Sequence, residues 1–316
     1  MKKALELLEK HYGYKNFKPG QLEIINNILR GRDSFCIMPT GGGKSLCYQI
    51  PALILNGITL VISPLISLMK DQVDSLEEVG IKAKYINSTQ SMDEIKDIFK
   101  ACQEGEVKLL YIAPERLESD YFTKMLKNLW ISQIAIDEAH CVSMWGHDFR
   151  TSYTYIEPFI NSLNIRPIVT TFTATATEAV KEDIIKLIKL KNPFMYIGSF
   201  DRENLEISVY KEEDKIEFVK DYIRENEEVS GIVYCLTRKE VDGLYTYLKE
   251  RGMSVAKYHG GLKDSEKNYY QEEFLKDNFN VMIATNAFGM GIDKSNVRYV
   301  IHFTLPKNLE SYYQEI

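Results

Sequence analysis

The sequence predicts an α/β protein made of two doubly wound parallel-sheet lobes in tandem. Short β-rich apolar runs alternate with amphipathic helical patterns along the whole chain, which is typical of parallel βαβ units. The 316 residues also exceed what one hydrophobic core usually serves. A polar stretch at residues 199–204 interrupts the alternation, and we place a hinge there. The first lobe should therefore span residues 1–198 and the second residues 199–316.

The first lobe is expected to begin with an amphipathic helix over residues 1–14. Acidic residues among its leucines, and the lack of a small-residue cleavage site, argue against a signal peptide. Strands are predicted at residues 34–38, 58–63, 82–86, 108–112, 133–137, 169–172 and 194–197. A further helix is predicted over residues 178–190.

The second lobe should open with a β-rich segment over residues 205–210. Helices are predicted over residues 215–225, 239–251 and 265–276, and strands over residues 231–235, 254–258, 280–284 and 297–303. This lobe has no glycine-lysine phosphate loop of its own. The two lobes are therefore predicted to share an architecture but not a chemistry.

Charge and cysteine content limit the possible functions. Lys and Arg total 39 against 45 Asp and Glu, a formal charge of −6, so any nucleic-acid site must be a local patch. The cysteines are never closer than 11 positions, which excludes CxxC spacing, so we expect no zinc and a reducing cytosolic location. The most apolar stretch, residues 51–62, falls short of the ~20 residues that span a bilayer.

A glycine-rich turn lies between the predicted strand 34–38 and a following helix. It comprises Thr40, Gly41, Gly42, Gly43, Lys44 and Ser45. Glycines let backbone N–H groups close around phosphate oxygens, and the helix N-terminus adds its positive dipole end. Lys44 is expected to reach the β/γ-phosphates and Ser45 to ligate Mg²⁺. The alternative is an ordinary βα turn with a chance lysine.

Two adjacent carboxylates, Asp137 and Glu138, follow the apolar strand that ends at Ile136. Open α/β sheets bind ligands at this end of their strands. We expect Asp137 to hold Mg²⁺ and Glu138 to orient and deprotonate the attacking water. An acidic pair after a strand can also serve as a helix N-cap. Together with the phosphate loop, however, the pair predicts a Mg²⁺-dependent nucleoside triphosphatase.

The sequence Asp-Glu-Ala-His at residues 137–140 resembles the DEAH motif of superfamily-two helicases. Within that superfamily, the chain from Tyr12 onward resembles RecQ-family DNA helicases. The resemblance implies two RecA-like lobes with ATP and Mg²⁺ bound between them, and a catalytic role for His140. It also implies 3′-to-5′ translocation on single-stranded DNA, or on DNA with a single-stranded 3′ end. A monomeric, nucleoid-associated protein of DNA repair, recombination or replication is expected.

The resemblance also assigns nucleotide-binding residues. Residues 17–21 resemble the family's adenine-reading segment, in which Tyr14 and Lys18 would stack on the base and Gln21 would hydrogen-bond its edge. The family usually has arginine where Lys18 stands, and lysine stacks less well. Small residues before Asp293 permit a close backbone approach, so that Asp293 can bond the ribose.

The expected DNA contacts lie at strand ends and in one loop. Residues 139–150 resemble the RecQ aromatic-rich loop, whose rings are natural stacking partners for unpaired bases. From that loop and from motif positions elsewhere we expect contacts by Ser63, Pro64, Arg116, Trp145, His147, Phe149, Arg150, Arg238 and His259. The loop's rings could instead pack in the core, and the other segments could be ordinary helix starts. Residues 173–177 resemble the superfamily's coupling motif, although such threonines also cap helices.

The family's last motif carries arginines that reach the γ-phosphate, and this chain stops at Ile316, where that motif should begin. An arginine finger contributes on the order of 10³–10⁵ in rate. We therefore expect the second lobe to be incomplete, the chain to be a fragment, and ATP to be bound but hydrolysed slowly. The alternatives are an ATP-gated single-stranded-DNA-binding module, an RNA helicase and a plain nucleotidase.

Overall fold

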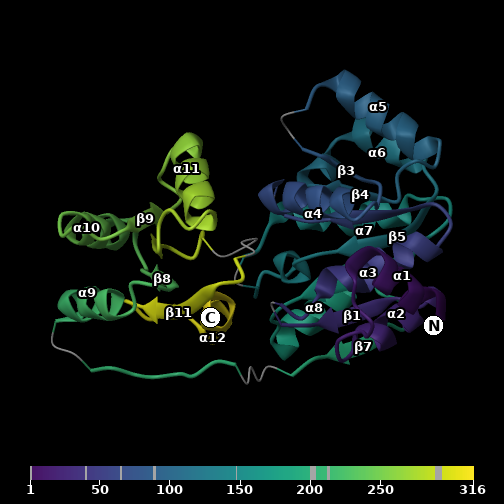
Figure 1. The fold of residues 1–316 in the computed structure, drawn as a ribbon. Helices are drawn as coiled ribbons and strands as arrows, with labels where there is room; N and C mark the ends of the chain where they lie inside the picture. The colour runs from purple at the N-terminus through teal and green to yellow at the C-terminus, as the bar shows by residue number, and fades with distance from the viewer. Residues whose placement is uncertain are drawn as a thin grey trace. The chain divides into compact units, whose positions relative to one another are not determined.

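The computed structural model describes residues 2–39, 41–64, 66–87, 90–146, 148–199, 204–211, 214–288 and 294–316, without the side chains of residues 66, 67 and 310. The chain divides into two compact units, Met1–Arg202 and Glu203–Ile316. Each unit is built on its own parallel sheet (Figure 1). No helix in the described part of the chain is long and apolar enough to cross a membrane.

Unit 1 contains a seven-stranded sheet in the order β3-β4-β2-β5-β6-β1-β7. Its strands are β1 (Ser34–Ile37), β2 (Ile58–Ile62), β3 (Ala83–Ile86), β4 (Leu109–Ile112), β5 (Ile131–Ile136), β6 (Ile168–Thr173) and β7 (Phe194–Ile197). Every pairing is parallel. The predicted α/β class with parallel sheets is thus confirmed. Strand β5 starts two residues before the predicted 133, because buried Ile131 already pairs with Ile58.

Helices cover both faces of this sheet, because alternate side chains of a strand point to opposite faces. The helices are α1 (Lys2–Tyr12), α2 (Gln21–Leu29), α3 (Lys44–Ile54), α4 (Ile66–Glu78), α5 (Met92–Gln103), α6 (Asp120–Lys127), α7 (Ile156–Asn161) and α8 (Glu178–Leu187). Helices α2, α3 and α4 pack with Cys36 and Val61 on one face. Helices α5 to α8 pack with Phe35 and Leu60 on the other. The fold is therefore doubly wound.

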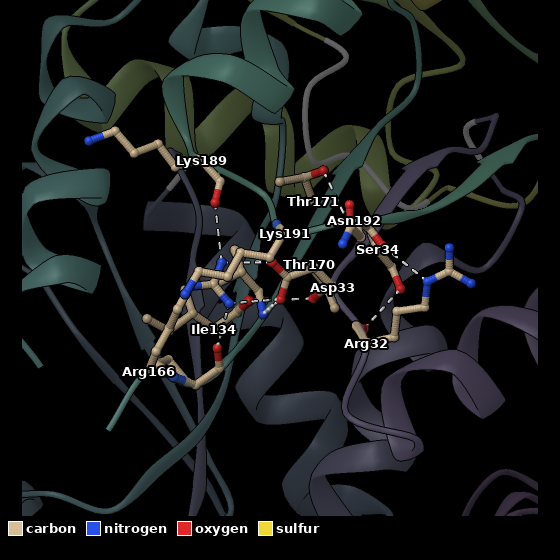
Figure 2. A network of polar contacts seen from close by, with 12 residues as sticks. Arg32, Asp33, Ser34, Ile134, Arg166, Thr170, Thr171, Lys189, Lys191 and Asn192 are labelled. Carbon is tan, nitrogen blue, oxygen red and sulfur yellow. Dashed lines mark hydrogen bonds and ion pairs between the residues drawn. The ribbon is translucent and has the colours of Figure 1, made fainter. Parts of the chain in front are cut away.

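A buried carboxylate lies at the end of the sheet where strands β1 and β6 begin (Figure 2). Asp33, which precedes β1 and is 3% exposed, accepts hydrogen bonds from the Arg166 guanidinium at 2.6 and 3.0 Å. It also accepts from the backbone N–H groups of Val169 at 3.0 Å and Lys191 at 2.7 Å. The same arginine donates to the Lys189 carbonyl. One carboxylate thus joins the starts of β1 and β6 to the α8–β7 connection.

Replacing Asp33 with alanine is expected to lower the free energy of unfolding by about 3 kcal/mol, because it leaves a largely buried guanidinium and two backbone N–H groups without their acceptor. Urea denaturation would measure the loss. Asp97→Ala, at an exposed carboxylate of α5, is the control and should change stability by less than about 0.5 kcal/mol. Equal losses in the two variants would show that the network contributes little.

Unit 2 contains a four-stranded parallel sheet in the order β11-β8-β10-β9. Its strands are β8 (Ser230–Tyr234), β9 (Val255–Tyr258), β10 (Val281–Ala284) and β11 (Val297–His302), and its helices are α9 (Lys215–Glu225), α10 (Arg238–Lys249), α11 (Asp264–Leu275) and α12 (Leu309–Glu315). Helices α9 and α10 pack against one face with Val233, whereas Phe274 of α11 packs against the other with Ile232.

The β-rich segment at residues 205–210 forms no strand. Its apolar side chains are exposed, up to 83% for Val209. β propensity reflects the fit of a side chain to a pleated, half-buried surface, and no strand in the described residues pairs with this segment. A local aromatic contact joins the Tyr210 and Phe218 rings, whose centroids lie 4.8 Å apart. An apolar alternation predicts a strand only where a ladder partner is available.

Candidate functional site

Most of the predicted unit 1 residues lie where its parallel strands end. Strands β5, β6 and β1 are neighbours in the sheet, so the segments that follow them meet at one edge. These segments are the acidic pair, the threonine segment 173–177 and the glycine-rich loop. The segments after β2, β4 and β3 continue along the same edge. Thr40, His147 and Asp293 lie outside the described residues.

The glycine-rich loop runs from the end of β1 to Lys44, the first residue of α3. Gly41 has a φ of 73° and Gly43 a φ of 76°, a left-handed conformation that side chains disfavour. Within the loop, the Gly42 N–H donates to the Pro39 carbonyl at 3.0 Å. The first N–H groups of α3 have no intrahelical acceptor. Such a helix start suits an anion, as the sequence predicts.

The acidic pair follows β5 directly. Asp137 is held by its backbone, whose N–H donates to Ile62 at 2.9 Å and whose carbonyl accepts from the buried Tyr153 hydroxyl at 2.8 Å. Glu138 has a φ of 46°, a left-handed conformation that costs a non-glycine residue roughly 1–2 kcal/mol. Strain of this kind often lies at functional sites. The turn places a Glu138 carboxylate oxygen 3.9 Å from the Lys44 ammonium, as a nucleotide site would need.

Burial and, to a smaller extent, the negative charge of Glu138 raise the pKa of Asp137 to about 6 against the opposing effect of Lys44. A cation bound next to this carboxylate would stabilise its ionised form. Among the described residues, no cluster of three or more His, Cys, Asp or Glu side chains could hold a metal alone. Ser45 and Asp137 offer a hydroxyl and a carboxylate oxygen, and Mg²⁺ commonly binds one or two carboxylates together with substrate phosphates.

The raised pKa of Asp137 predicts pH-dependent nucleotide binding. The pKa of Asp137 is higher in the folded protein than in the unfolded chain. Protonation of Asp137 therefore stabilises the folded state at pH values below the pKa of the unfolded chain, and this stabilisation is lost as pH rises through about 6. Mg²⁺ binding requires the ionised carboxylate, so binding a non-hydrolysable Mg²⁺–ATP analogue should release about half a proton at pH 6 and almost none at pH 8. Titration calorimetry in two buffers measures this release. Asp137→Asn should abolish it, and release by that variant would rule out Asp137 as the source.

The histidine of the acidic motif faces the threonine segment. His140 is 2% exposed, and its Nδ1 lies 3.0 Å from the Thr173 hydroxyl and 3.3 Å from a Glu138 carboxylate oxygen. The Thr173 hydroxyl donates to the Thr175 carbonyl at 2.8 Å, so it accepts from Nδ1–H of the imidazole. His140 therefore connects the acidic pair to the end of β6.

The predicted adenine-reading segment contacts the phosphate loop. Gln21 is 1% exposed, and its amide donates to the Gly43 carbonyl at 3.0 Å and the Gly42 carbonyl at 3.4 Å. The Lys18 ammonium donates to the Gly41 carbonyl at 2.8 Å. Tyr14 is 60% exposed, which leaves its ring open for stacking. As placed, Gln21 and Lys18 contact the phosphate loop, which the sequence did not predict.

The aromatic loop, residues 139–150, begins with η2 (Ala139–Val142) and leads into η3 (Thr151–Tyr155). Trp145 is 78% exposed and Phe149 is 39% exposed, so these rings do not pack in the core. The Arg150 guanidinium donates to Asp148 at 2.8 Å and to the Pro64 carbonyl at 2.9 Å. Its backbone N–H donates to Cys141 at 2.9 Å and closes the loop. The loop therefore presents rings to solvent, while its arginine braces it against the segment after β2.

Other predicted contacts are partly internal. The Ser63 hydroxyl is buried and has no hydrogen-bond partner among the described residues. The half-buried Arg116 donates to the Asn87 carbonyl. In unit 2, Arg238 is exposed in the first turn of α10. His259 is 5% exposed; its Nδ1 accepts from the Gly261 N–H at 3.1 Å, which leaves Nε2 to donate to Asp242 at 3.4 Å.

Two positions of the site were not identified from the sequence. Tyr153 fixes the Asp137 carbonyl, and Asp183 on α8 accepts a hydrogen bond of 2.6 Å from Ser143 in the aromatic loop. Asp183 is an ordinary polar position on an amphipathic helix, so nothing in the sequence pattern marks it. Tyr153 lies just after the aromatic-rich segment 139–150, and its residue type alone does not show that its hydroxyl is buried.

Comparisons with known proteins agree with this geometry. Residues 18–183 match the DEAD/DEAH box helicase family, and residues 214–316 match the helicase conserved C-terminal domain. The chain is 51% identical over 314 residues to the ATP-dependent DNA helicase RecQ of Bacillus subtilis, covering 99% of this chain and 53% of that protein. It is 46% identical over 312 residues to the protein of the same name from Pasteurella multocida, covering 99% and 49%. The chain thus spans about half the length of these relatives.

Solved structures share the fold. Dbp5 of S. cerevisiae bound to RNA and ADP BeF3 matches with a TM-score of 0.78 and 18% identity, covering 100% of this chain and 83% of that one. The helicase MrfA bound to DNA matches with a TM-score of 0.77 and 18% identity, covering 99% and 46%. The predicted RecA-like architecture is thereby confirmed. The chain belongs to the DEAD/DEAH box helicase family, and its sequence is consistent with a RecQ-type helicase core.

Proposed function

We propose that this chain is the motor core of a DNA helicase that couples ATP hydrolysis to movement along single-stranded DNA. The observation that carries the proposal is the position of the aromatic loop. Trp145, 78% exposed, follows the acidic pair by only seven residues and lies on the loop that Ser143 and Arg150 hold. A base stacked on this ring would therefore be bound by a residue that is close in sequence to the groups that act on the γ-phosphate.

The proposed chemistry at the phosphates uses groups of unit 1. The N–H groups at the start of α3 and the Lys44 ammonium bind the phosphate oxygens. Ser45 and Asp137 would hold Mg²⁺, which when bound would supply positive charge next to the phosphate oxygens. Glu138, whose carboxylate lies 3.9 Å from the Lys44 ammonium, orients and deprotonates the attacking water.

The contacts of His140 support a route from hydrolysis to DNA. Its imidazole faces both Glu138 and Thr173, so a change in the position of Glu138 after hydrolysis would alter the hydrogen bond to the threonine segment. Movement from 3′ to 5′, a monomeric state, and a role in repair, recombination or replication are further proposals. They rest on the likeness to proteins named ATP-dependent DNA helicase RecQ.

The chain offers a matched pair of tryptophans for testing the proposal. Trp145 follows the carboxyl end of β5, whereas Trp130, 67% exposed, precedes its other end. Stacking on a base is worth about 1–3 kcal/mol, so Trp145→Ala should weaken binding of an oligo-dT strand about tenfold and reduce DNA-stimulated phosphate release similarly. Trp130→Ala should change neither. Equal effects of the two variants would contradict a stacking role for the loop.

The same assay distinguishes the proposed motor from other outcomes. Phosphate release that DNA does not stimulate, together with ATP-dependent DNA binding, would indicate a binding module with little hydrolysis. Competition between oligo-dT and oligo-U of equal length tests the choice of DNA over RNA. The proposal expects hydrolysis above background, stimulation by DNA and a preference for oligo-dT.

A further inference from the structure

Asp183 lies on α8, next to the aromatic loop but outside the ATP site. The Ser143 hydroxyl, which is fully buried, donates to the Asp183 carboxylate at 2.6 Å. The same oxygen accepts a hydrogen bond from the Trp145 backbone N–H at 3.1 Å. A carboxylate acceptor makes the first of these bonds short and strong, and fixes the direction of the hydroxyl proton. Through Ser143, Asp183 thus determines where the backbone of Trp145 can lie.

The loop has little freedom to compensate for the loss of this contact. The Ser143 N–H donates to the His140 carbonyl at 3.1 Å, and the Gly146 N–H donates to the Ser143 carbonyl at 3.0 Å. A Cβ on Gly146 would lie 2.4 Å from the His140 carbonyl oxygen, so the turn there is already tight. Ser143 is therefore the point at which the exposed turn is attached to the buried part of the unit.

Helix α8 also connects this point to the threonine segment. Thr177 caps the helix, with its hydroxyl accepting from the Val180 N–H at 3.4 Å, and the described chain runs directly from Thr173 of β6 through Thr177 into α8. Val180 and Ile184 anchor the helix in the core. Asp183 therefore lies on a packed helix whose first turn follows the segment that His140 contacts.

We propose that Asp183 is a positioning residue that holds Trp145 in its DNA-binding place and transmits movement of the threonine segment to the aromatic loop. This inference rests on the proposed stacking of Trp145 on DNA. In this proposal Asp183 acts through Ser143 and not by direct contact with nucleotide or DNA. Its effect is expected on the affinity for DNA and on the dependence of that affinity on nucleotide, rather than on nucleotide binding.

The test uses Asp183→Ala, Asp183→Asn, Ser143→Ala and the double variant in a Trp130→Phe background, where Trp145 is the remaining tryptophan. Asp183→Ala should weaken oligo-dT binding about tenfold, as expected for the loss of a hydrogen bond to a charged group. Asp183→Asn, which keeps an acceptor, should lose less. The double variant should lose no more than Ser143→Ala alone, because both act through one contact. Glu182→Ala, at the exposed neighbouring carboxylate, is the control.

Two further readouts separate a positioning role from a merely structural one. Acrylamide quenching of Trp145 fluorescence should differ between Asp183→Ala and the parent. In the parent the quenching should change when a non-hydrolysable ATP analogue is added, and in Asp183→Ala it should not. A lowered melting temperature with unchanged DNA affinity and quenching would overturn the proposal. Additive losses in the double variant would also overturn it.

Failure of this inference can be told apart from failure of the proposed function. If Trp145→Ala leaves DNA binding unchanged, the stacking role itself is wrong. If Trp145→Ala weakens binding but Asp183→Ala does not, the stacking role stands and the positioning role is wrong. Should Asp183→Ala fail to fold, the same comparison can use Asp183→Asn, which is nearly isosteric, and Ser143→Ala, which removes only the loop hydroxyl.

Discussion

Glu138→Gln is expected to slow ATP hydrolysis about 10²–10⁴-fold while leaving ATP binding close to that of the parent chain. Glutamine keeps the size of the side chain and its hydrogen bonding to water, but it cannot take the proton. The phosphate loop and Lys44 remain in place, so phosphate binding should persist. Single-turnover phosphate release measures the chemical step, and a fluorescent ATP analogue measures binding.

Two comparisons sharpen this experiment. Glu118→Gln, at an exposed glutamate of η1 (Pro114–Glu118), should leave both quantities unchanged. Because the charge of Glu138 raises the pKa of Asp137, Glu138→Gln should also move proton release on Mg²⁺–nucleotide binding to a pH below 6. Full turnover in Glu138→Gln would exclude the water-activating role. Loss of binding would instead show that Glu138 mainly orders the phosphate loop.

The sequence predicted the strands well because they are short, largely apolar runs, most of which are buried. Residues 34–37 illustrate this, since all four are buried and pair on both sides with β6 and β7. The segment at 205–210 carries the same pattern but has no ladder partner among the described residues, and the prediction of a β element was wrong there. An alternation of apolar and polar residues indicates that a segment could form a strand with one buried face. It does not indicate whether a neighbouring strand is present to pair with it.

The glycine-rich loop and the acidic pair could be located because their chemistry is contiguous in sequence. The contacts that orient them are not. Arg150 reaches a carbonyl 86 positions away, and Asp33 gathers donors at positions 166, 169 and 191. Sequence suggested Arg150 as a DNA contact, which stays a prediction, but it could not show that the guanidinium also donates within the protein. Side chains of one type can bind a ligand or brace a loop, and only the fold decides which.

The same distinction applies to Gln21 and His259. Both are polar residues in recognisable segments, yet Gln21 is 1% exposed with its amide on the phosphate loop, and His259 is 5% exposed with both ring nitrogens engaged. Their expected roles toward adenine and DNA remain proposals. A role that acts through neighbours would fit these contacts: Gln21 would shape the phosphate loop, and His259 would hold the turn at Gly261 beside Arg238.

Lys44→Ala is expected to weaken ATP binding at least 100-fold and to remove measurable turnover. The Lys44 side chain is 16% exposed, and its ammonium is the cation that lowers the pKa of Asp137. Its removal takes away a direct phosphate contact and also raises the pKa of Asp137 above about 6, which disfavours Mg²⁺ binding near neutral pH. Calorimetric titration with a Mg²⁺–ATP analogue at pH 6.5 and 8.0 measures both effects. The deficit should be smaller at pH 8.0, where the carboxylate is ionised again.

Lys100→Ala is a close control, because Lys100 also lies 3.9 Å from a glutamate, Glu104, but is 72% exposed. An exposed pair of this kind contributes at most about 1 kcal/mol, so Lys100→Ala should bind ATP like the parent chain. ATP affinity within threefold of the parent in Lys44→Ala would contradict the phosphate-loop assignment. Glu138→Gln should lose the chemical step and keep binding, whereas Lys44→Ala should lose binding first. This opposite order separates the residue that acts on water from the residue that holds the phosphates, although their side chains lie within one ion-pair distance.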